Sequence, residues 1–237
     1  MALEASTLLF VGIFVRLAAA GVALLAWYHH REVVCLLGWS LAMVLSAFAM
    51  AVGSLRGADN ALDVTLMTNV MFVTGYTLMW TSMRRFNDDR VKPIDQLIGV
   101  LVAAGAFVAL FALAWWFGAP RRALSALFSL FVAGLTLAAA WETWRGFGRD
   151  GLGSRHIAGT ALACIAATRL IRVTLIGLQT SGAVSPATGE LVQSFTLYFN
   201  IAFLLAATFG LVLMAQEWVD NRSTRPEASR RGPGQGP

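Results

Sequence analysis

Seven apolar runs, each about 20 residues long, constrain the fold of this chain more than any other feature of its sequence. A transmembrane α-helix needs about 20 consecutive, mainly apolar residues, and inside a bilayer only helices or closed barrels satisfy every backbone polar group. The sequence therefore predicts an all-α bundle of seven transmembrane helices. The expected spans are Thr7–Tyr28, Val33–Val52, Ala61–Met83, Leu97–Phe117, Arg122–Trp144, His156–Leu178 and Leu191–Val212.

Composition favours the same class of protein. The chain of 237 residues is 57% hydrophobic and 13% charged, whereas soluble domains carry about 25% charged residues. Because the spans leave only short loops, we expect one transmembrane domain over residues 1–222. Residues 223–237 are dominated by Pro, Gly and Arg and include no large apolar side chain, which predicts a disordered cytoplasmic tail.

Lysine and arginine are distributed unequally between the two sides of the predicted bundle. Cytoplasmic loops of membrane proteins carry an excess of these residues. Twelve lie in one set of loops and the tail, and three in the other set, which predicts an outside N-terminus and a cytoplasmic C-terminus. The twelve are Arg31, Arg84, Arg85, Arg90, Lys92, Arg145, Arg149, Arg155, Arg222, Arg225, Arg230 and Arg231, and the three are Arg56, Arg121 and Arg122. This asymmetry accounts for the formal charge of +5, so we expect no nucleic-acid partner.

The remaining three arginines, Arg16, Arg169 and Arg172, lie inside expected spans. A charged residue near the bilayer centre costs about 2.5–3.5 kcal/mol on insertion scales and normally faces a protein interior or a water-filled cavity. Arg16 and Arg169 each lie about 14 Å from the outer end of their span, and Arg172 one turn closer. Asn69 and Asn200 fall at about 12–14 Å. We therefore expect one polar level inside the bundle.

Two interpretations of this level compete: a structural hydrogen-bond network, or a cavity that binds a ligand. No Asp or Glu lies at this depth in any expected span; Asp63 and Glu190 lie near the outer ends. Three cations without a carboxylate at their level favour an outward-facing cavity for a polar or anionic ligand. The expected ligand-binding residues are Arg16, Asn69, Arg169, Arg172 and Asn200.

Other chemistries find less support in the residues. A retinal photoreceptor needs a lysine in its last span, but Lys92 lies in a loop and is the chain's only lysine. A proton pump would use carboxylates deep in the membrane, whereas Asp63 and Glu142 lie at the ends of their expected spans. The three histidines are scattered, and no metal-ligand cluster forms around them. We expect no catalytic residues, no metal and no cofactor.

Two short segments resemble a known family. The third span ends in Met-Arg-Arg-Phe-Asn-Asp-Asp-Arg (Met83–Arg90), and the last span leaves the membrane as Phe-Gly-Leu-Val-Leu-Met-Ala-Gln-Glu (Phe209–Glu217). With seven N-out spans, these segments resemble the membrane-sensor half of bacterial GGDEF-domain diguanylate cyclases, where the first stretch often reads Gly-x-Arg-Arg-Phe-x-Gly-Arg. The resemblance implies a sensory role, a juxtamembrane motif and a location in a bacterial inner membrane. The matching residues are Arg84, Arg85, Phe86 and Arg90.

The chain departs from that family beyond the last span. It contains no Gly-Gly-Asp/Glu-Glu-Phe motif and no cyclase domain, so the resemblance does not extend to cyclase activity, GTP or magnesium. We expect a non-catalytic sensor or signal-transducing module whose output domain is lost or supplied in trans. Its expected partners are the lipid bilayer, a small polar or anionic ligand, and a second copy or a separate cytoplasmic signalling protein. The alternative is a small transporter or channel for a polar or anionic solute.

Overall fold

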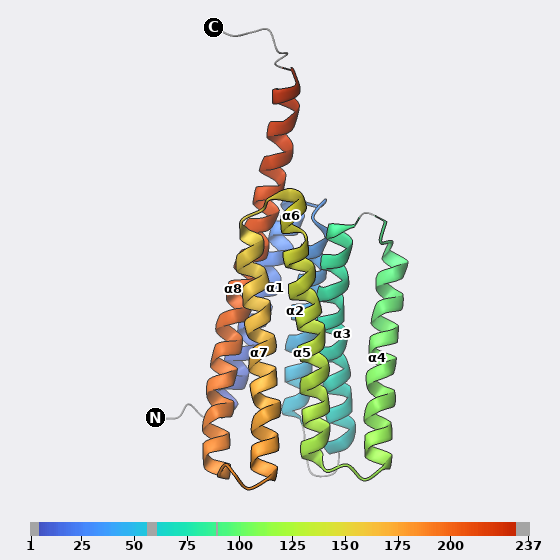
Figure 1. Cartoon of the computed structure of the whole chain (residues 1–237), viewed down its shortest axis with the longest axis vertical. Helices are drawn as coiled ribbons and strands as arrows, with labels where there is room; N and C mark the ends of the chain where they lie inside the picture. Colours follow the sequence, from blue (N-terminus) through green and yellow to red (C-terminus); the bar gives the residue numbers. More distant parts are fainter. Residues whose placement is uncertain (1–4, 56–60, 89, 231–237) are drawn as a thin grey trace.

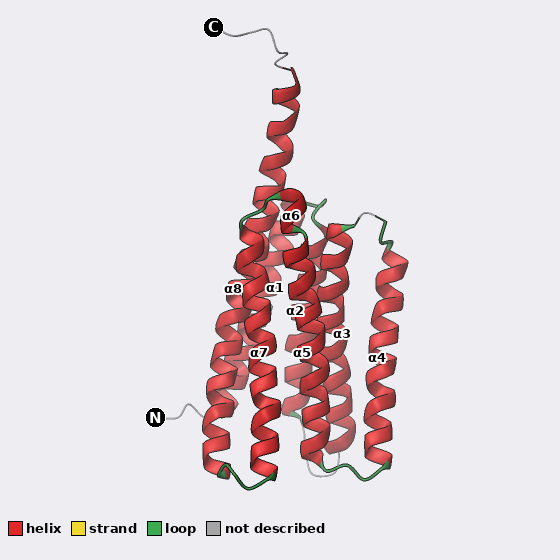
Figure 2. Cartoon of the chain, viewed as in Figure 1, coloured by secondary structure: helices red, strands yellow, loops and turns green. Residues whose placement is uncertain are grey.

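The computed structural model describes residues 5–55, 61–88 and 90–230, and all regular structure in this part of the chain is helical (Figure 2). Each of the seven expected spans coincides with one long helix. A further four-residue helix, α6, lies between the fifth and sixth expected spans. The helices are α1 (Ala5–His29), α2 (Val34–Ser54), α3 (Ala61–Asn87), α4 (Pro93–Trp116), α5 (Arg121–Arg145), α6 (Phe147–Asp150), α7 (Ser154–Thr180) and α8 (Pro186–Arg230).

Six of these helices are long and apolar enough to cross a membrane, namely α1, α2, α4, α5, α7 and α8. This is the character of a multi-pass membrane protein. The exception is α3, which carries the buried polar residues Asn69, Thr77, Thr81 and Ser82. Because α3 packs against α2, α4 and α5, neighbouring helices cover these side chains. Thr77 and Thr81 also donate to carbonyls of α3 itself, at 2.8 Å each.

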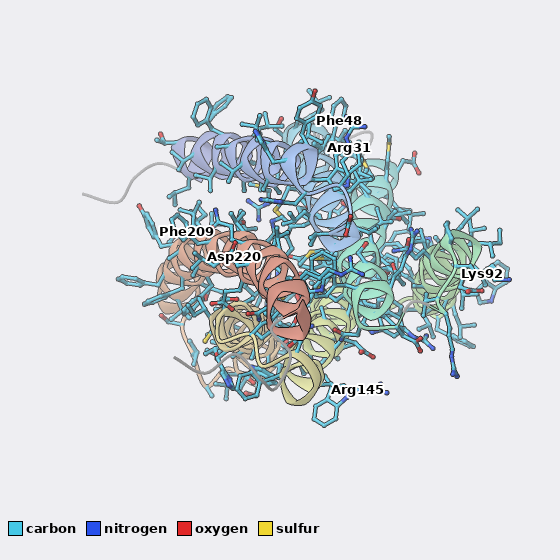
Figure 3. All side chains as sticks on the ribbon, turned by 90° about the horizontal axis from the view of Figure 1, so that it is seen from above. Arg31, Phe48, Lys92, Arg145, Phe209 and Asp220 are labelled. Carbon is cyan, nitrogen blue, oxygen red and sulfur yellow. The ribbon has the colours of Figure 1, made fainter. Side chains whose placement is uncertain are left out.

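Six helices form a closed ring in the order α1, α2, α3, α5, α7, α8, with α8 returning to α1. The helix α4 lies outside this ring, against α3 and α5 (Figures 1 and 3). Only Phe107 and Phe111 of α4 are buried. The outer surface of the bundle is apolar: Phe48 is 62% exposed and Phe209 71% exposed, and both lie at the periphery (Figure 3). An apolar surface of this extent matches a lipid environment.

The helices run alternately, so the bundle has two distinct ends (Figure 1). We call the end where α1, α3, α5 and α8 begin the lower end, and the opposite end, where α4 and α7 begin, the upper end. Small residues allow close packing between neighbouring helices. At Gly210 of α8, an added Cβ would lie 2.7 Å from the backbone nitrogen of Ala158 in α7, so this contact requires glycine.

The last helix runs from the lower end through the bundle and projects beyond the upper end (Figure 1). The boundary expected at Ser223 is not a helix end, because α8 continues to Arg230. The projecting part has no neighbouring helix in the figure. The sequence of residues 223–230 includes no large apolar residue that could form such a contact. Residues 231–237 of the expected tail lie outside the described part of the chain, and disorder there stays a prediction.

Candidate functional site

A cavity of about 340 Å³ lies in the lower half of the bundle. This volume is within the range of small-molecule sites. Residues from all seven long helices line it, and four of the five expected ligand-binding residues are among them: Arg16, Asn69, Arg169 and Arg172. The other lining residues are Met50, Leu62, Thr65, Phe72, Phe111, Arg121, Leu124, Ser125, Phe128 and Leu197.

The arginines meet because of where they lie along antiparallel helices. Arg16 lies as many residues after Ala5, where α1 begins, as Arg169 lies before Thr180, where α7 ends. Since α1 begins and α7 ends at the lower end, both residues reach the same depth. Arg172 is one turn closer to that end on the same face of α7. The depth argument from the sequence therefore predicted this convergence correctly.

Arg16 is the most buried of the three arginines, at 2% exposed. Its Nη1 donates to the carbonyl oxygen of Gly12 in the same helix at 3.0 Å, so the side chain runs back toward the lower end, as helix geometry favours. Its Nε is buried without a hydrogen-bond partner among the described residues. A buried, unpaired donor on a cation is costly, and it is expected where a ligand completes the site.

Arg169 and Arg172 have long contacts with neighbouring hydroxyl groups. Arg169 Nη2 donates to the Tyr76 hydroxyl at 3.4 Å, and Arg172 Nη2 to Ser125 Oγ at 3.3 Å. Both distances are at the weak end of the range for N–H···O bonds. The Nε of Arg169 is also buried without a partner in the described part of the chain. A guanidinium carries five N–H donors, so most of them stay available to a group in the cavity.

Every charged residue in the described lining is an arginine. Arg121, the first residue of α5, is a fourth lining arginine, and the sequence placed it in an outer loop without a role. The charge of Arg169 acts on both Arg16 and Arg172, so Arg169 repels each of them. The described lining residues include no Asp or Glu. An anion in the cavity would relieve this repulsion.

Apolar side chains complete the cavity, among them Phe72, Phe111 and Phe128. The rings of Phe72 and Phe128 pack with their centroids 6.0 Å apart. Charge-assisted hydrogen bonds are stronger in such low-dielectric surroundings. The site therefore suits a ligand with one anionic group and an apolar body.

Asn200 is the one expected ligand-binding residue that is not part of the lining described for this cavity. It is 4% exposed and lies on α8, where its Nδ2 donates to Thr168 Oγ1 of α7 at 3.4 Å. Its depth is as predicted, but its side chain faces the neighbouring helix. Depth along a span does not fix the direction of a side chain around the helix, and this explains the difference.

The expected juxtamembrane motif lies at the upper end but is not one contact cluster. Arg85 Nη1 donates to Gln96 Oε1 at 3.2 Å. Phe86 packs against Trp218 of α8, with ring centroids 6.1 Å apart. Arg84 and Arg90 are exposed. Phe86 and Arg85 therefore have packing partners, while the other two arginines face away from the bundle.

The sequence missed the buried charge at the upper end, which is Arg155. This residue, assigned to a cytoplasmic loop from the sequence, is 2% exposed. Its Nε donates to both carboxylate oxygens of Asp150 at 3.0 Å, and its Nη1 donates to Asn87 Oδ1 at 2.9 Å and the Thr143 carbonyl oxygen at 3.1 Å. The guanidinium also lies 5.2 Å from the ring centroid of Phe86. Side chains of α3, α6 and α7 thus join at one cation.

The turn between α5 and α7 makes room for this cation. A Cβ at Gly146 would overlap the Arg155 guanidinium, and Gly151 has a φ of 68°, in the left-handed region that favours glycine. In the sequence, the only indication of this buried contact was that Asp150 and Arg155 are five residues apart with glycines between them. It could not be recognised without the α6 turn that folds Asp150 back toward Arg155.

Fold and cavity together define a multi-pass helical bundle with a cationic cavity in one half. No family model matches the chain, and no curated protein or solved structure shows detectable similarity to it.

Proposed function

We propose that this protein is a non-catalytic membrane sensor that binds an anionic ligand in the arginine-lined cavity. The cavity carries the proposal: four arginines line it, two of them have buried Nε atoms without partners in the described part of the chain, and no described lining residue is a carboxylate. Arginine is suited to carboxylate and phosphate groups because its planar fork donates two parallel hydrogen bonds.

The cavity occupies one half of the bundle, which favours a receptor over a conduit. On α2, Met50 lines the cavity, whereas Val34 lines a separate hollow at the upper end. Between them lie the buried residues Trp39 and Met43. Trp39 Nε1 donates to Thr208 Oγ1 of α8 at 3.0 Å, across the middle of the bundle. A solute would have to displace this packed layer to cross.

The helix α8 offers a route for a signal. Leu197 of α8 lines the cavity, and further along the same helix Glu217 Oε2 accepts hydrogen bonds from the backbone nitrogen and Oγ of Ser154, at 3.2 and 2.8 Å. Trp218 then packs against Phe86. One continuous helix thus joins the cavity to the upper end and to the projecting segment. The resemblance to diguanylate cyclase sensor regions agrees with output at this end, delivered to a second copy or a separate signalling protein.

The proposed orientation places the cavity on the outside and the projecting end of α8 in the cytoplasm. We expect a reporter that is active only in the periplasm to be silent when fused after Arg231, because the positively charged loops stay inside. The same reporter inserted after Pro120, between α4 and α5, should be active. A strong periplasmic signal after Arg231 would reverse the orientation and the outward opening of the cavity.

A transporter is the second candidate, because the same arginines would attract a solute. A sensor binds without translocation, so we expect proteoliposomes to show saturable binding of radiolabelled phosphate at the outer face but no uptake above that of empty liposomes. Loading the proteoliposomes with unlabelled phosphate, which would drive exchange through a transporter, should not change this result. Uptake that is saturable and lost in Arg169→Met would establish transport and replace the sensor proposal.

A further inference from the structure

A second hollow adjoins the cavity between α5 and α7. A hollow of about 230 Å³ between the first turn of α5 and the last part of α7 shares Arg121, Ser125 and Arg172 with it. We call this hollow the side opening. Its other lining residues are Arg122, Leu175, Ile176, Gln179 and Gly189. The cavity and the side opening therefore adjoin along these three shared residues, and Arg122 adds a further cation beside them.

An apolar groove on the outer face of α7 adjoins the side opening in turn. It is a shallow strip lined by α7 alone, and it shares Leu175 with the opening. Its residues follow a helical stripe and are Ala167, Leu170, Ile171, Thr174, Leu175 and Leu178. Leu170, Ile171 and Leu178 are more than 40% exposed. The stripe is about 16 Å long and runs from the lower end toward the middle of the bundle.

We propose that the anionic ligand is an amphiphile, which reaches the cavity from the membrane through the side opening. This inference rests on the proposed function. Its phosphate or carboxylate head lies at Arg121 and Arg172, which the cavity and the side opening share, and its hydrocarbon tail lies along the groove on α7. The proposal rests on the order in which the three hollows adjoin one another. The cationic cavity is followed by the side opening and then by the apolar groove, as the charged head of an amphiphile is followed by its apolar tail. The apolar rings in the cavity itself accommodate the carbons next to the head group.

The direction of the groove agrees with the proposed orientation. With the lower end outside, a lipid of the outer leaflet has its head group near that end and its tail pointing toward the bilayer centre. The groove runs the same way, from Leu178 to Ala167. The tail leaves one apolar environment for another, so it adds little hydrophobic free energy. Its contribution is to concentrate the head group at the level of the arginines.

The test uses the full chain in phosphatidylcholine nanodiscs and compares equilibrium binding of radiolabelled inorganic phosphate with that of dodecyl phosphate. We expect dodecyl phosphate to reach half-saturation at a concentration about tenfold lower or less. Leu175→Trp, which fills the junction of side opening and groove, should remove this advantage and leave phosphate binding unchanged. Leu178→Trp is a second variant at a position already exposed, so its folding is secure. Leu130→Trp, on the exposed face of α5, is the matched control.

The possible outcomes test the lateral route, the anion-binding cavity and the source of the ligand separately. If both probes bind equally, or if Leu130→Trp weakens dodecyl phosphate as much as Leu175→Trp and Leu178→Trp do, the lateral route is wrong while the cavity proposal stands. If neither probe binds to the wild type, the cavity proposal fails as well. Binding of inorganic phosphate alone would identify a soluble ligand. Loss of dodecyl phosphate binding in both groove variants, with phosphate binding retained, is the result that supports a lipid-derived ligand.

Discussion

Replacing Arg155 with alanine is expected to destabilise the bundle by about 3–5 kcal/mol, the usual cost of breaking a buried ion pair by removing one partner. Asp150 would lose the cation that it binds through both carboxylate oxygens, and Asn87 and the Thr143 carbonyl would each lose a donor. The Asp150 side chain is 25% exposed, so water can replace part of the lost interaction. The effect should therefore lie near the lower end of this range.

Unfolding in mixed micelles with increasing SDS, followed by circular dichroism, measures this change. Arg84→Ala removes the same side chain from an exposed position on α3 and should stay within about 0.5 kcal/mol of wild type. The double variant Arg155→Ala with Asp150→Ala should be more stable than the sum of the single effects predicts, by about 0.5–3 kcal/mol. Equal, small effects of Arg155→Ala and Arg84→Ala would show that the buried cation does not hold the upper end together.

The sequence predicted the positions of the long helices, six of which are long and apolar enough to cross a membrane, because lipid imposes length and hydrophobicity on each span. It also predicted that Arg16, Asn69, Arg169 and Arg172 share a level, because antiparallel helices convert residue number into depth. It did not reveal that α3 is shielded by its neighbours, nor that Asn200 turns toward Thr168. Arg121 and Arg155 were missed because both lie at helix ends beside loops, where tertiary packing alone buries Arg155 and brings the exposed Arg121 to the edge of the cavity.

Arg169→Met is expected to abolish anion binding. In phosphate-free buffer, the variant should be as stable as the wild type or more stable. The substitution removes a cation that repels Arg16 and Arg172 and a buried Nε without a partner in the described chain. Methionine is flexible and of similar length, so it fills the site without a large cavity. The interaction lost is the 3.4 Å contact with the Tyr76 hydroxyl. The variant thus distinguishes the two interpretations: unchanged or higher stability indicates a binding site, and lower stability indicates a structural network.

In a structural network, the same substitution would leave partner groups unsatisfied, at a cost of about 1–3 kcal/mol. A ligand site behaves differently when the anion is present. At a phosphate concentration of 100 times Kd, a one-site ligand stabilises the folded state by about 2.7 kcal/mol. Phosphate also stabilises proteins non-specifically, so Arg84→Met, which removes an exposed arginine at the upper end, is the control for both charge and salt.

The most direct measurement is the unfolding temperature of wild type, Arg169→Met and Arg84→Met in detergent, in a low-salt HEPES buffer without carboxylate anions, with and without added phosphate. We predict a saturable, phosphate-dependent rise in wild type and Arg84→Met, and no rise beyond the common salt effect in Arg169→Met, whose unfolding temperature without phosphate is equal to or above that of wild type. A lower unfolding temperature of Arg169→Met in phosphate-free buffer, with the same phosphate response in all three proteins, would contradict the anion-binding cavity.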